Sequence, residues 1–213
     1  MISRPQVGVL AVQGAFTEHE DALRTVGADT RQVRVPEELD GLDGLVIPGG
    51  ESTTIGLVAG RSGLLEQIRR RIDEGLPVFG TCAGMIMLAG ETTSGEQALI
   101  GGMDTVVRRN AFGRQVASFE TDLVMPTVGD TPMPAVFIRA PWIETHGPDV
   151  EILAEVHGHP VAARQAHMLV TAFHPEFTDD RRMHALFVDM VRASIARTAA
   201  DDAAGGAVRV RAQ

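Results

Sequence analysis

The sequence predicts one α/β domain with three layers: a mostly parallel central sheet, helices on both of its faces, and a small antiparallel elaboration. Apolar runs alternate with amphipathic stretches over roughly the first 90 residues, and Gly or Pro separates them. This alternation is typical of a doubly wound parallel sheet. At 213 residues, with 44% hydrophobic and 22% charged, the chain suits one such domain and is short for two. We expect the domain at residues 1–198 and a disordered tail at 199–213, where apolar mass is lacking.

The first half of the chain supplies most of the expected parallel strands. Gln6–Val12 is a nearly continuous apolar run, which suits a strand buried on both faces. Further strands are expected at Thr30–Val35, at Gly44–Ile47 and in the apolar run that ends at Gly80; helical spacing is found at Thr17–Val26, Ile55–Ala59 and Gly63–Gly75, with a short helical connection at Pro36–Leu39.

The character of the sequence changes between about Gly90 and Glu155. Short apolar stretches lie between Gly- and Pro-rich loops, and we read them as an antiparallel elaboration: Thr105–Val107, Gln115–Phe119 and Ala135–Ile138. After it we expect a hairpin at Val150–Ala163, a strand at Met168–Phe173 and a last amphipathic helix at Met183–Ala196.

Composition excludes several classes of function. A formal net charge of −9 argues against a nucleic-acid binder, whose footprint is a basic patch. No apolar run approaches the roughly 20 residues that span a membrane, and the first residues lack the apolar core of a signal peptide. We therefore expect a cytoplasmic protein without membrane contact.

A metal site is not expected either. The single cysteine excludes an internal disulfide and a metal site of the CxxC kind. His157 and His159 form a His-x-His pair, but no third ligand is evident near them, so we read them as turn histidines.

The single cysteine, Cys82, lies where an apolar run ends in Gly-x-Cys-x-Gly and a helix follows. The related pattern Gly-x-Ser-x-Gly builds the sharp turn that presents a serine nucleophile. A helix that begins directly after the sulfur favours the thiolate form. The alternative is a small buried apolar side chain, as most free cysteines are. A nucleophile would also need a base, an orienting acid and an oxyanion site.

One histidine stands out as the base. Of seven histidines, only His174 follows a predicted core strand directly, and only it has a carboxylate, Glu176, two residues later. In an extended segment these two side chains face the same way, so Glu176 can orient the ring of His174. By itself, His-Pro-Glu is a weak signal.

A glycine-rich turn, Pro48-Gly49-Gly50-Glu51-Ser52, follows the strand that begins at Gly44. Glycines let successive amides point at one anion, as in a phosphate cradle or an oxyanion hole. The Gly-Lys-Ser/Thr of a phosphate-binding loop is absent, so the oxyanion interpretation is preferred. Gln13 ends the first strand, where ligands of open α/β sheets bind, although a polar loop residue is equally consistent with the pattern.

Together these motifs resemble the class I, or triad, glutamine amidotransferases. The closer resemblance is to the glutaminase subunits of pyridoxal 5'-phosphate synthases. It is carried by Val12-Gln13-Gly14-Ala15, by Pro48 to Thr54 (PGGESTT), by Arg109 to Gln115 (RNAFGRQ), by Phe137 to Pro141 (FIRAP) and by Phe173-His174-Pro175-Glu176. These blocks lie within residues 7–192, and residues 1–198 would then form a single glutaminase domain.

The resemblance implies a role for each matching residue. Cys82 would be the nucleophile, His174 the base and then the acid, and Glu176 the residue that orients His174. Contacts with L-glutamine are implied for Gly50, Glu51, Ser52, Arg109, Ile138 and Arg139, and oxyanion or activation roles for Gly49, Gly50, Ala83 and Gln13. On pattern alone, Arg109 and Arg139 are equally well interpreted as surface or structural ion-pair residues.

The resemblance also implies a partner, a (β/α)8-barrel synthase subunit that uses the released ammonia, in a complex of twelve copies of each subunit. Pyridoxal 5'-phosphate would be the product of the complex, and the chain itself would need no cofactor. Our hypothesis is that docking turns the peptide after Gly49 and brings Gln13 into the interface. Two alternatives remain: the glutaminase of another triad amidotransferase, such as the one serving imidazole glycerol phosphate synthesis, or a non-catalytic regulatory subunit.

Overall fold

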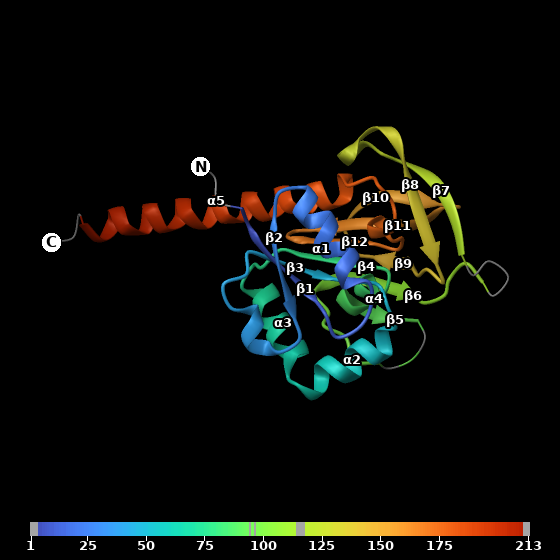
Figure 1. The fold of residues 1–213 in the computed structure, drawn as a ribbon, viewed down its shortest axis with the longest axis horizontal. Helices are drawn as coiled ribbons and strands as arrows, with labels where there is room; N and C mark the ends of the chain where they lie inside the picture. Colours follow the sequence, from blue (N-terminus) through green and yellow to red (C-terminus); the bar gives the residue numbers. More distant parts are fainter. Residues whose placement is uncertain (1–3, 94, 96, 114–117, 211–213) are drawn as a thin grey trace.

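A seven-stranded sheet forms the centre of the computed structural model, which describes residues 4–93, 95, 97–113 and 118–210 (Figure 1). Across the sheet the order is β10 (Glu151–Val156), β11 (His159–Gln165), β12 (Met168–Thr171), β4 (Val78–Thr81), β3 (Gly44–Ile47), β1 (Gln6–Leu10) and β2 (Asp29–Val33). The pairs from β2 to β12 are parallel, and β10 and β11 add an antiparallel edge.

Helices cover both faces of this sheet (Figure 1). On one face lie α1 (Phe16–Thr25) and the start of α5 (Arg182–Val210), which contact each other; on the other lie α2 (Ser52–Arg61), α3 (Leu64–Asp73) and α4 (Ala83–Leu88). A short 3-10 helix, η1 (Pro36–Leu39), connects β2 to β3. The predicted three-layer α/β fold is therefore confirmed.

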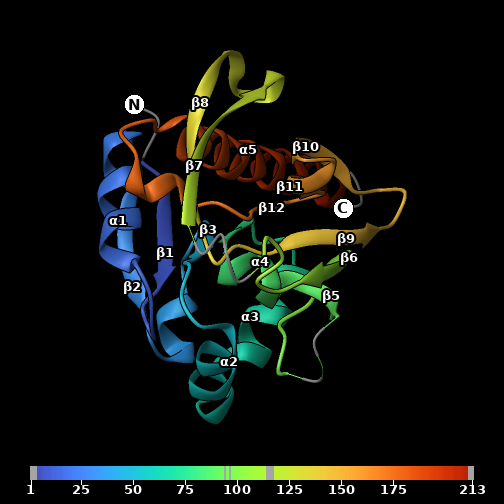
Figure 2. The same ribbon diagram turned by 90° about the vertical axis from the view of Figure 1, so that its right-hand side faces the viewer.

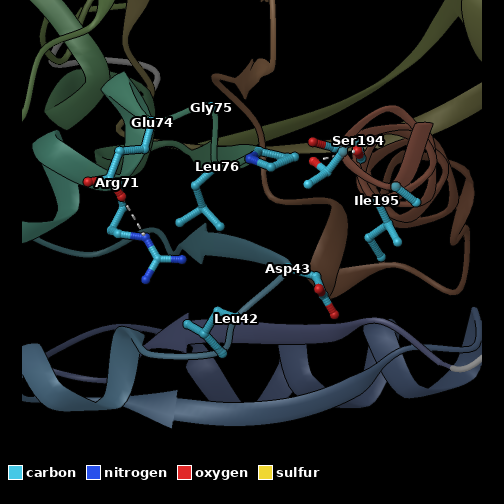
Figure 3. A pocket seen from close by; sticks show the side chains of 11 residues that line it. Leu42, Asp43, Arg71, Glu74, Gly75, Leu76, Ser194 and Ile195 are labelled. Atoms are coloured by element: carbon cyan, nitrogen blue, oxygen red, sulfur yellow. Dashed lines mark hydrogen bonds and ion pairs between the residues drawn. The ribbon is translucent and has the colours of Figure 1, made fainter. Parts of the chain in front are cut away.

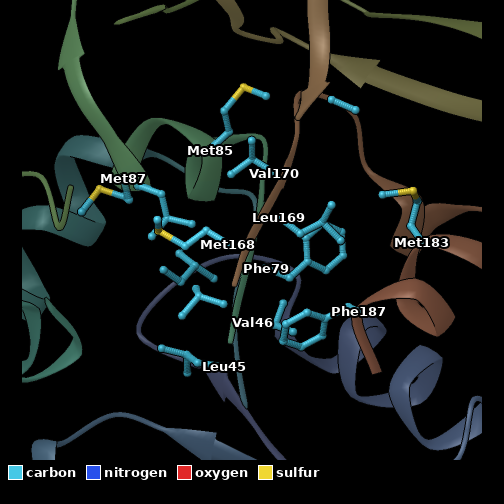
Figure 4. Close-up of a cluster of buried hydrophobic side chains, with 14 of the residues drawn as sticks. Leu45, Val46, Phe79, Met85, Met87, Met168, Leu169, Val170, Met183 and Phe187 are labelled. Atoms are coloured by element: carbon cyan, nitrogen blue, oxygen red, sulfur yellow. The ribbon is translucent and has the colours of Figure 1, made fainter. Parts of the chain in front are cut away.

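The core lies on both sides of the sheet because the inner strands are buried throughout. Every residue of β3, β4 and β12 is buried. Figure 4 shows Phe79 and Leu169 of these strands, with Met85 of α4 on one side and Phe187 of α5 on the other. Continuous apolar runs were the feature from which buried parallel strands were predicted.

The elaboration consists of two small sheets. One holds β5 (Ala89–Thr92), β6 (Met103–Arg108) and β9 (Trp142–His146); the other is the hairpin of β7 (Ser118–Met125) and β8 (Gly129–Ile138), with the 3-10 helix η2 (Pro126–Val128) at its turn. The predicted antiparallel elaboration is confirmed in the pairs β6–β9 and β7–β8, whereas β5 and β6 pair in parallel. Residues 115–117 of the strand expected at Gln115–Phe119 lie outside the described residues.

Figure 2 shows the β7–β8 hairpin reaching toward the first turns of α5. There the guanidinium of Arg182 donates to the carbonyl oxygens of Thr131 and Pro132 and pairs with Asp180. This joint ties β8, which ends at Ile138, to the segment that follows β12.

The last helix is longer than predicted. We expected it to end at Ala196, but α5 continues to Val210, so the predicted end of the helix is wrong. The domain boundary at residue 198 and the tail beyond it remain predictions, and residues 211–213 lie outside the described part of the chain. The extension is Ala-rich, Ala has the highest helix propensity, and lengthening an existing helix avoids the cost of nucleation. Among the described residues, no helix combines the length and the apolar character needed to cross a membrane.

Candidate active site

The parallel strands bring the predicted site residues together at their carboxyl ends. Cys82 follows β4, the turn at Gly49 and Gly50 follows β3, Gln13 follows β1, and His174 follows β12. These four strands are neighbours in the sheet. Segments that are far apart in the sequence therefore meet at one edge, as expected for a ligand site in an open α/β sheet.

Cys82 occupies a sharp corner between β4 and α4. Its backbone has φ 49° and ψ −100°, a region that non-glycine residues rarely adopt. The neighbouring glycines permit the corner, because a Cβ on Gly80 would lie 2.6 Å from the backbone of Gly84, and a Cβ on Gly84 would collide with the carbonyl oxygen of Ile47. The Cys82 amide donates to Thr171 O at 2.7 Å, which fixes the corner against β12.

His174 and Glu176 form a buried pair beside this sulfur. Nδ1 of His174 lies 2.8 Å from Oε1 of Glu176, and the ring lines the same hollow as Cys82. The pairing was predicted, but for an incorrect local reason: Pro175–Phe177 is a 3-10 turn, not an extended segment.

Burial and hydrogen bonding shift the pKa values of His174 and Glu176 in opposite directions. For His174, burial lowers the pKa, but the hydrogen bonds with Cys82 and Glu176 outweigh it and raise the pKa to about 10. For Glu176, burial raises the pKa, but His19 and His174 together hold it well below its usual range. The pair therefore favours an imidazolium next to a carboxylate.

A hollow of about 230 Å³ opens in front of Cys82 and His174. Its lining includes most of the residues predicted for substrate contact or activation: Gln13, Gly50, Glu51, Ser52, Arg109, Ile138 and Arg139. Ile86 and Asn110 also line it and were missed. Spacing could have suggested Ile86, which is one helical turn after Cys82 on α4. Gly49, Ala83 and Glu176 are not among the lining residues.

The glycine-rich turn is held from two sides. The Gly49 amide donates to Oγ1 of Thr81 at 3.0 Å, and the Glu51 amide donates to Oε1 of Gln13 at 2.7 Å. Within the described residues, the Gly50 amide between them makes no hydrogen bond. Ala83 is the first residue of α4, so its amide has no acceptor within the helix. Both amides are available to an anion.

Arg109 is held by Glu51 at the rim of the hollow. Its Nη2 lies 2.9 Å from Oε1 of Glu51, and its Nη1 lies 2.9 Å from Oε1 of Gln97. Glu51 also caps α2, accepting from the amides of Thr53 and Thr54. Burial raises the pKa of Glu51, but the hydrogen bonds from Thr53 and Thr54 together outweigh it and lower the pKa to about 2. Arg109 therefore forms an ion pair with Glu51, as the structural interpretation of the sequence expects, and it also lines the hollow.

The described residues, those of this site included, contain no group of three or more His, Cys, Asp or Glu side chains able to hold a metal ion. His159, of the His-x-His pair, stacks on Trp142 with 3.6 Å between ring centroids. A larger hollow of about 480 Å³ lies at the opposite edge of the sheet, between α3 and α5 (Figure 3). There Arg71 pairs with Glu74, and none of the predicted catalytic residues lines it.

Comparisons with known proteins agree with this geometry. A family model described as the SNO glutamine amidotransferase family matches residues 9–193. A protein of Parafrankia sp. named pyridoxal 5'-phosphate synthase subunit PdxT is 57% identical over 196 residues, 91% of this chain and 97% of that protein. A protein of the same name from Mycolicibacterium vanbaalenii is 58% identical, over 88% of this chain and 98% of its own.

Among solved structures, one described as a glutamine amidotransferase has a TM-score of 0.83 and 48% identity, and the match covers 87% of this chain and 98% of the other. A putative GMP synthase protein from Thermoplasma acidophilum has a TM-score of 0.64 at 22% identity over 92% of this chain and 98% of its own, a likeness of fold only. The family match spans most of the chain and includes the corner, the glycine-rich turn and the His-Pro-Glu segment. This chain therefore belongs to the SNO glutamine amidotransferase family.

Proposed function

We propose that this chain is the glutaminase subunit of a pyridoxal 5'-phosphate synthase, and that it hydrolyses the side-chain amide of L-glutamine to glutamate and ammonia. The observation that carries the chemistry is the placement of Cys82, at its strained corner, and of the paired His174 in the lining of one hollow. The choice among amidotransferases rests on relatives named PdxT that match nearly the whole chain.

In the first half of the reaction, the Cys82 thiolate attacks Cδ of glutamine. A tetrahedral intermediate forms, and the amides of Gly50 and Ala83 donate to its oxyanion. The His174 imidazolium gives its proton to the amide nitrogen, the C–N bond breaks, and ammonia leaves. Glu176 keeps the ring oriented and stabilises its charge throughout.

The second half releases glutamate. His174, now neutral, takes a proton from water, and the resulting hydroxide attacks the γ-glutamyl thioester. The same two amides hold the second oxyanion, the C–S bond breaks, and the sulfur leaves as the thiolate beside the imidazolium. One oxyanion donor is worth about 3 kcal/mol in such reactions, so the orientation of the Gly50 amide strongly influences the rate.

Glutamine is held through its charged α-substituents. In our proposal Arg109, Arg139 and the Ser52 amide bind the α-carboxylate, and Ile138 O, which lies 3.9 Å from the Cys82 sulfur, borders the reacting end. Since Arg109 is already paired with Glu51, the incoming carboxylate shares this guanidinium with a fixed partner. The reaction uses protein groups alone, so we propose neither a cofactor nor a metal.

The proposed partner is a (β/α)8-barrel synthase subunit in a complex with twelve copies of each. In our account docking rearranges the turn at Gly49 and Gly50, which the Gln13 side chain braces through the Glu51 amide. A non-catalytic subunit would have no need to retain Cys82, His174 and Glu176 together. Cytoplasmic location remains a prediction.

The proposal is tested in the complex with the synthase subunit, supplied with either glutamine or ammonium salt. We expect the native complex to form pyridoxal 5'-phosphate from both nitrogen sources, and the complex with Cys82→Ala to form it from ammonium alone. A Cys82→Ala complex that still uses glutamine would refute the proposed nucleophile.

A further inference from the structure

Two buried histidines lie behind the catalytic residues, and the mechanism above uses neither. His19 is on α1 and His184 on α5, and both are fully buried. Nδ1 of His19 lies 3.0 Å from Nε2 of His184, although 165 residues separate them in the chain. Both rings pack edge-on against Phe79, which Figure 4 shows in the core. Buried ring nitrogens in such surroundings need hydrogen-bond partners.

The other nitrogen of His19 faces the back of the active site. Its Nε2 lies 3.4 Å from Oε2 of Glu176 and 3.1 Å from Oγ1 of Thr81. His174 occupies the first oxygen of Glu176, whereas Oε2 makes no hydrogen bond among the described residues, and Nε2 of His19 is the nitrogen that approaches it. His19 is therefore the group placed to stabilise the second oxygen of this buried carboxylate.

The positions of the ring hydrogens follow from these contacts. If Nε2 of His19 carried no hydrogen, its lone pair would face the carboxylate, and Oε2 would be a buried anionic oxygen without a donor, which is costly. With the hydrogen on Nε2, a neutral His19 leaves Nδ1 free to accept from Nε2–H of His184. Nδ1 of His184 has no partner among the described residues. In this arrangement it carries no hydrogen, so no buried N–H group is left without an acceptor.

We propose that His19 is a positioning residue for the reaction, donating from Nε2 to Oε2 of Glu176, and that His184 fixes the tautomer of His19 from behind. This inference rests on the catalytic roles proposed above for Cys82, His174 and Glu176. Glu176 then receives one imidazole N–H on each oxygen, from His174 in front and from His19 behind, so that it stays ionised and immobile while His174 moves its proton.

The same network reaches the oxyanion turn. Oγ1 of Thr81, beside Nε2 of His19, accepts the amide of Gly49. Thr81 immediately precedes Cys82, so one side chain connects the glycine-rich turn, the nucleophile corner and the histidine pair. A change at His19 therefore acts on the orientation of the reacting groups and not on the binding of glutamine, which occurs on the other side of His174.

Few charged groups surround this carboxylate. His174 faces Glu176 from its own segment and His19 faces it from α1, while Cys82 lies beyond His174 on the corner before α4. On α5, His184 lies behind His19, and the nearby Arg181 disfavours its protonation; burial and these neighbours lower the pKa of His184 to about 3. The neutral form of His184 is therefore favoured.

The test uses two variants of similar size, each in complex with the synthase subunit. His19→Gln retains an N–H near the position of Nε2, whereas His19→Met removes it. Altering the orienting carboxylate of a comparable triad costs about 10⁴-fold in kcat, and we expect His19→Met, one step further away, to lower kcat roughly 10-fold with KM unchanged. Without its second donor, Glu176 binds a proton more readily, so the acidic limb of the kcat profile should shift to higher pH.

We expect His19→Gln to restore the native pH profile and most of kcat. His167→Met is the control, because Nε2 of His167 donates to Ile72 O, at the far end of the sheet. A His19→Met variant with native kcat and an unshifted acidic limb would overturn the proposal, as would equal losses in both His19 variants with no shift. Cys82→Ala in the same assay tests the triad separately.

Nitrogen NMR of the histidine rings gives a second test on the chain alone, independent of turnover. We expect the hydrogen of His19 on Nε2 and a bare Nδ1 on His184. A hydrogen on Nδ1 of a neutral His19 would contradict the proposed donor.

Discussion

At the scale of single residues, the backbone of Cys82 combines catalytic geometry with strain. A φ of 49° with ψ of −100° is unfavourable for a side chain with a Cβ and readily adopted by glycine. The corner therefore holds the sulfur in place at a cost in stability. The strain belongs to the backbone and persists when only the sulfur is removed.

We predict that Cys82→Gly is more stable than Cys82→Ala, by about 1 kcal/mol after the entropy cost of glycine. Both variants lack the nucleophile and are inactive. Urea unfolding of the two variants provides the comparison. If Cys82→Ala proved equally stable or more so, the corner would not be strained.

His174 gives a second prediction at this scale. Its pKa of about 10 reflects hydrogen bonds with Cys82 and Glu176 that outweigh burial, so Cys82→Ala should lower it, as NMR titration of the ring would measure. The folded pKa lies above the unfolded value of about 6.5. Stability from this proton is therefore complete below pH 6.5 and is lost as the pH rises through about 10. A pKa unchanged in Cys82→Ala would refute the contact.

At the scale of elements, the site depends on how closely α4 approaches the neighbouring strands. A Cβ on Gly84 would meet the backbone oxygen of Ile47 in β3, which cannot move without disturbing the sheet. We predict that Gly84→Ala destabilises the fold by roughly 2–4 kcal/mol, in the range of overpacked cores, and abolishes glutaminase activity.

Gly60→Ala is the matched control for this substitution. Gly60 is exposed on α2, and a Cβ there would have only an ordinary contact with Leu65. Because alanine is the better helix former, we expect Gly60→Ala to be neutral or to stabilise by up to about 1 kcal/mol. Similar unfolding midpoints for the two variants would contradict the role assigned to the close approach.

Local patterns explain which elements could be predicted from the sequence. The corner at Cys82 could be predicted because its pattern, with Gly80 and Gly84 on either side, lies within five residues. Buried parallel strands could be predicted because continuous apolar runs are local features of the sequence. The parallel β5–β6 pair and the length of α5 depend on packing and on the preceding helix, which no local pattern contains. His19 and His184 meet only through the fold, so their contact behind Glu176 was not predicted.

At the scale of the whole molecule, the active site and the end of α5 are separate. Buried side chains of α5 extend to Val191, and the residues from Arg192 to Asp201 are exposed or half-buried. The family model also ends at residue 193.

We predict that ending the chain after Thr198 changes the free energy of unfolding by no more than about 0.5 kcal/mol, as is usual for surface changes, and leaves glutamine hydrolysis intact. Thermal unfolding and glutamate release of the shortened chain are the measurements. A marked loss of either would assign the removed residues a role that the exposure of residues 192–201 does not indicate.

The most direct test of the central claim is glutamate release from glutamine by this chain, alone and with the synthase subunit, beside Cys82→Ala under both conditions. Our account predicts slow release by the native chain alone, much faster release with the partner, and none from Cys82→Ala. Equal rates with and without the partner would contradict gating of the oxyanion turn, and release by Cys82→Ala would contradict the triad itself.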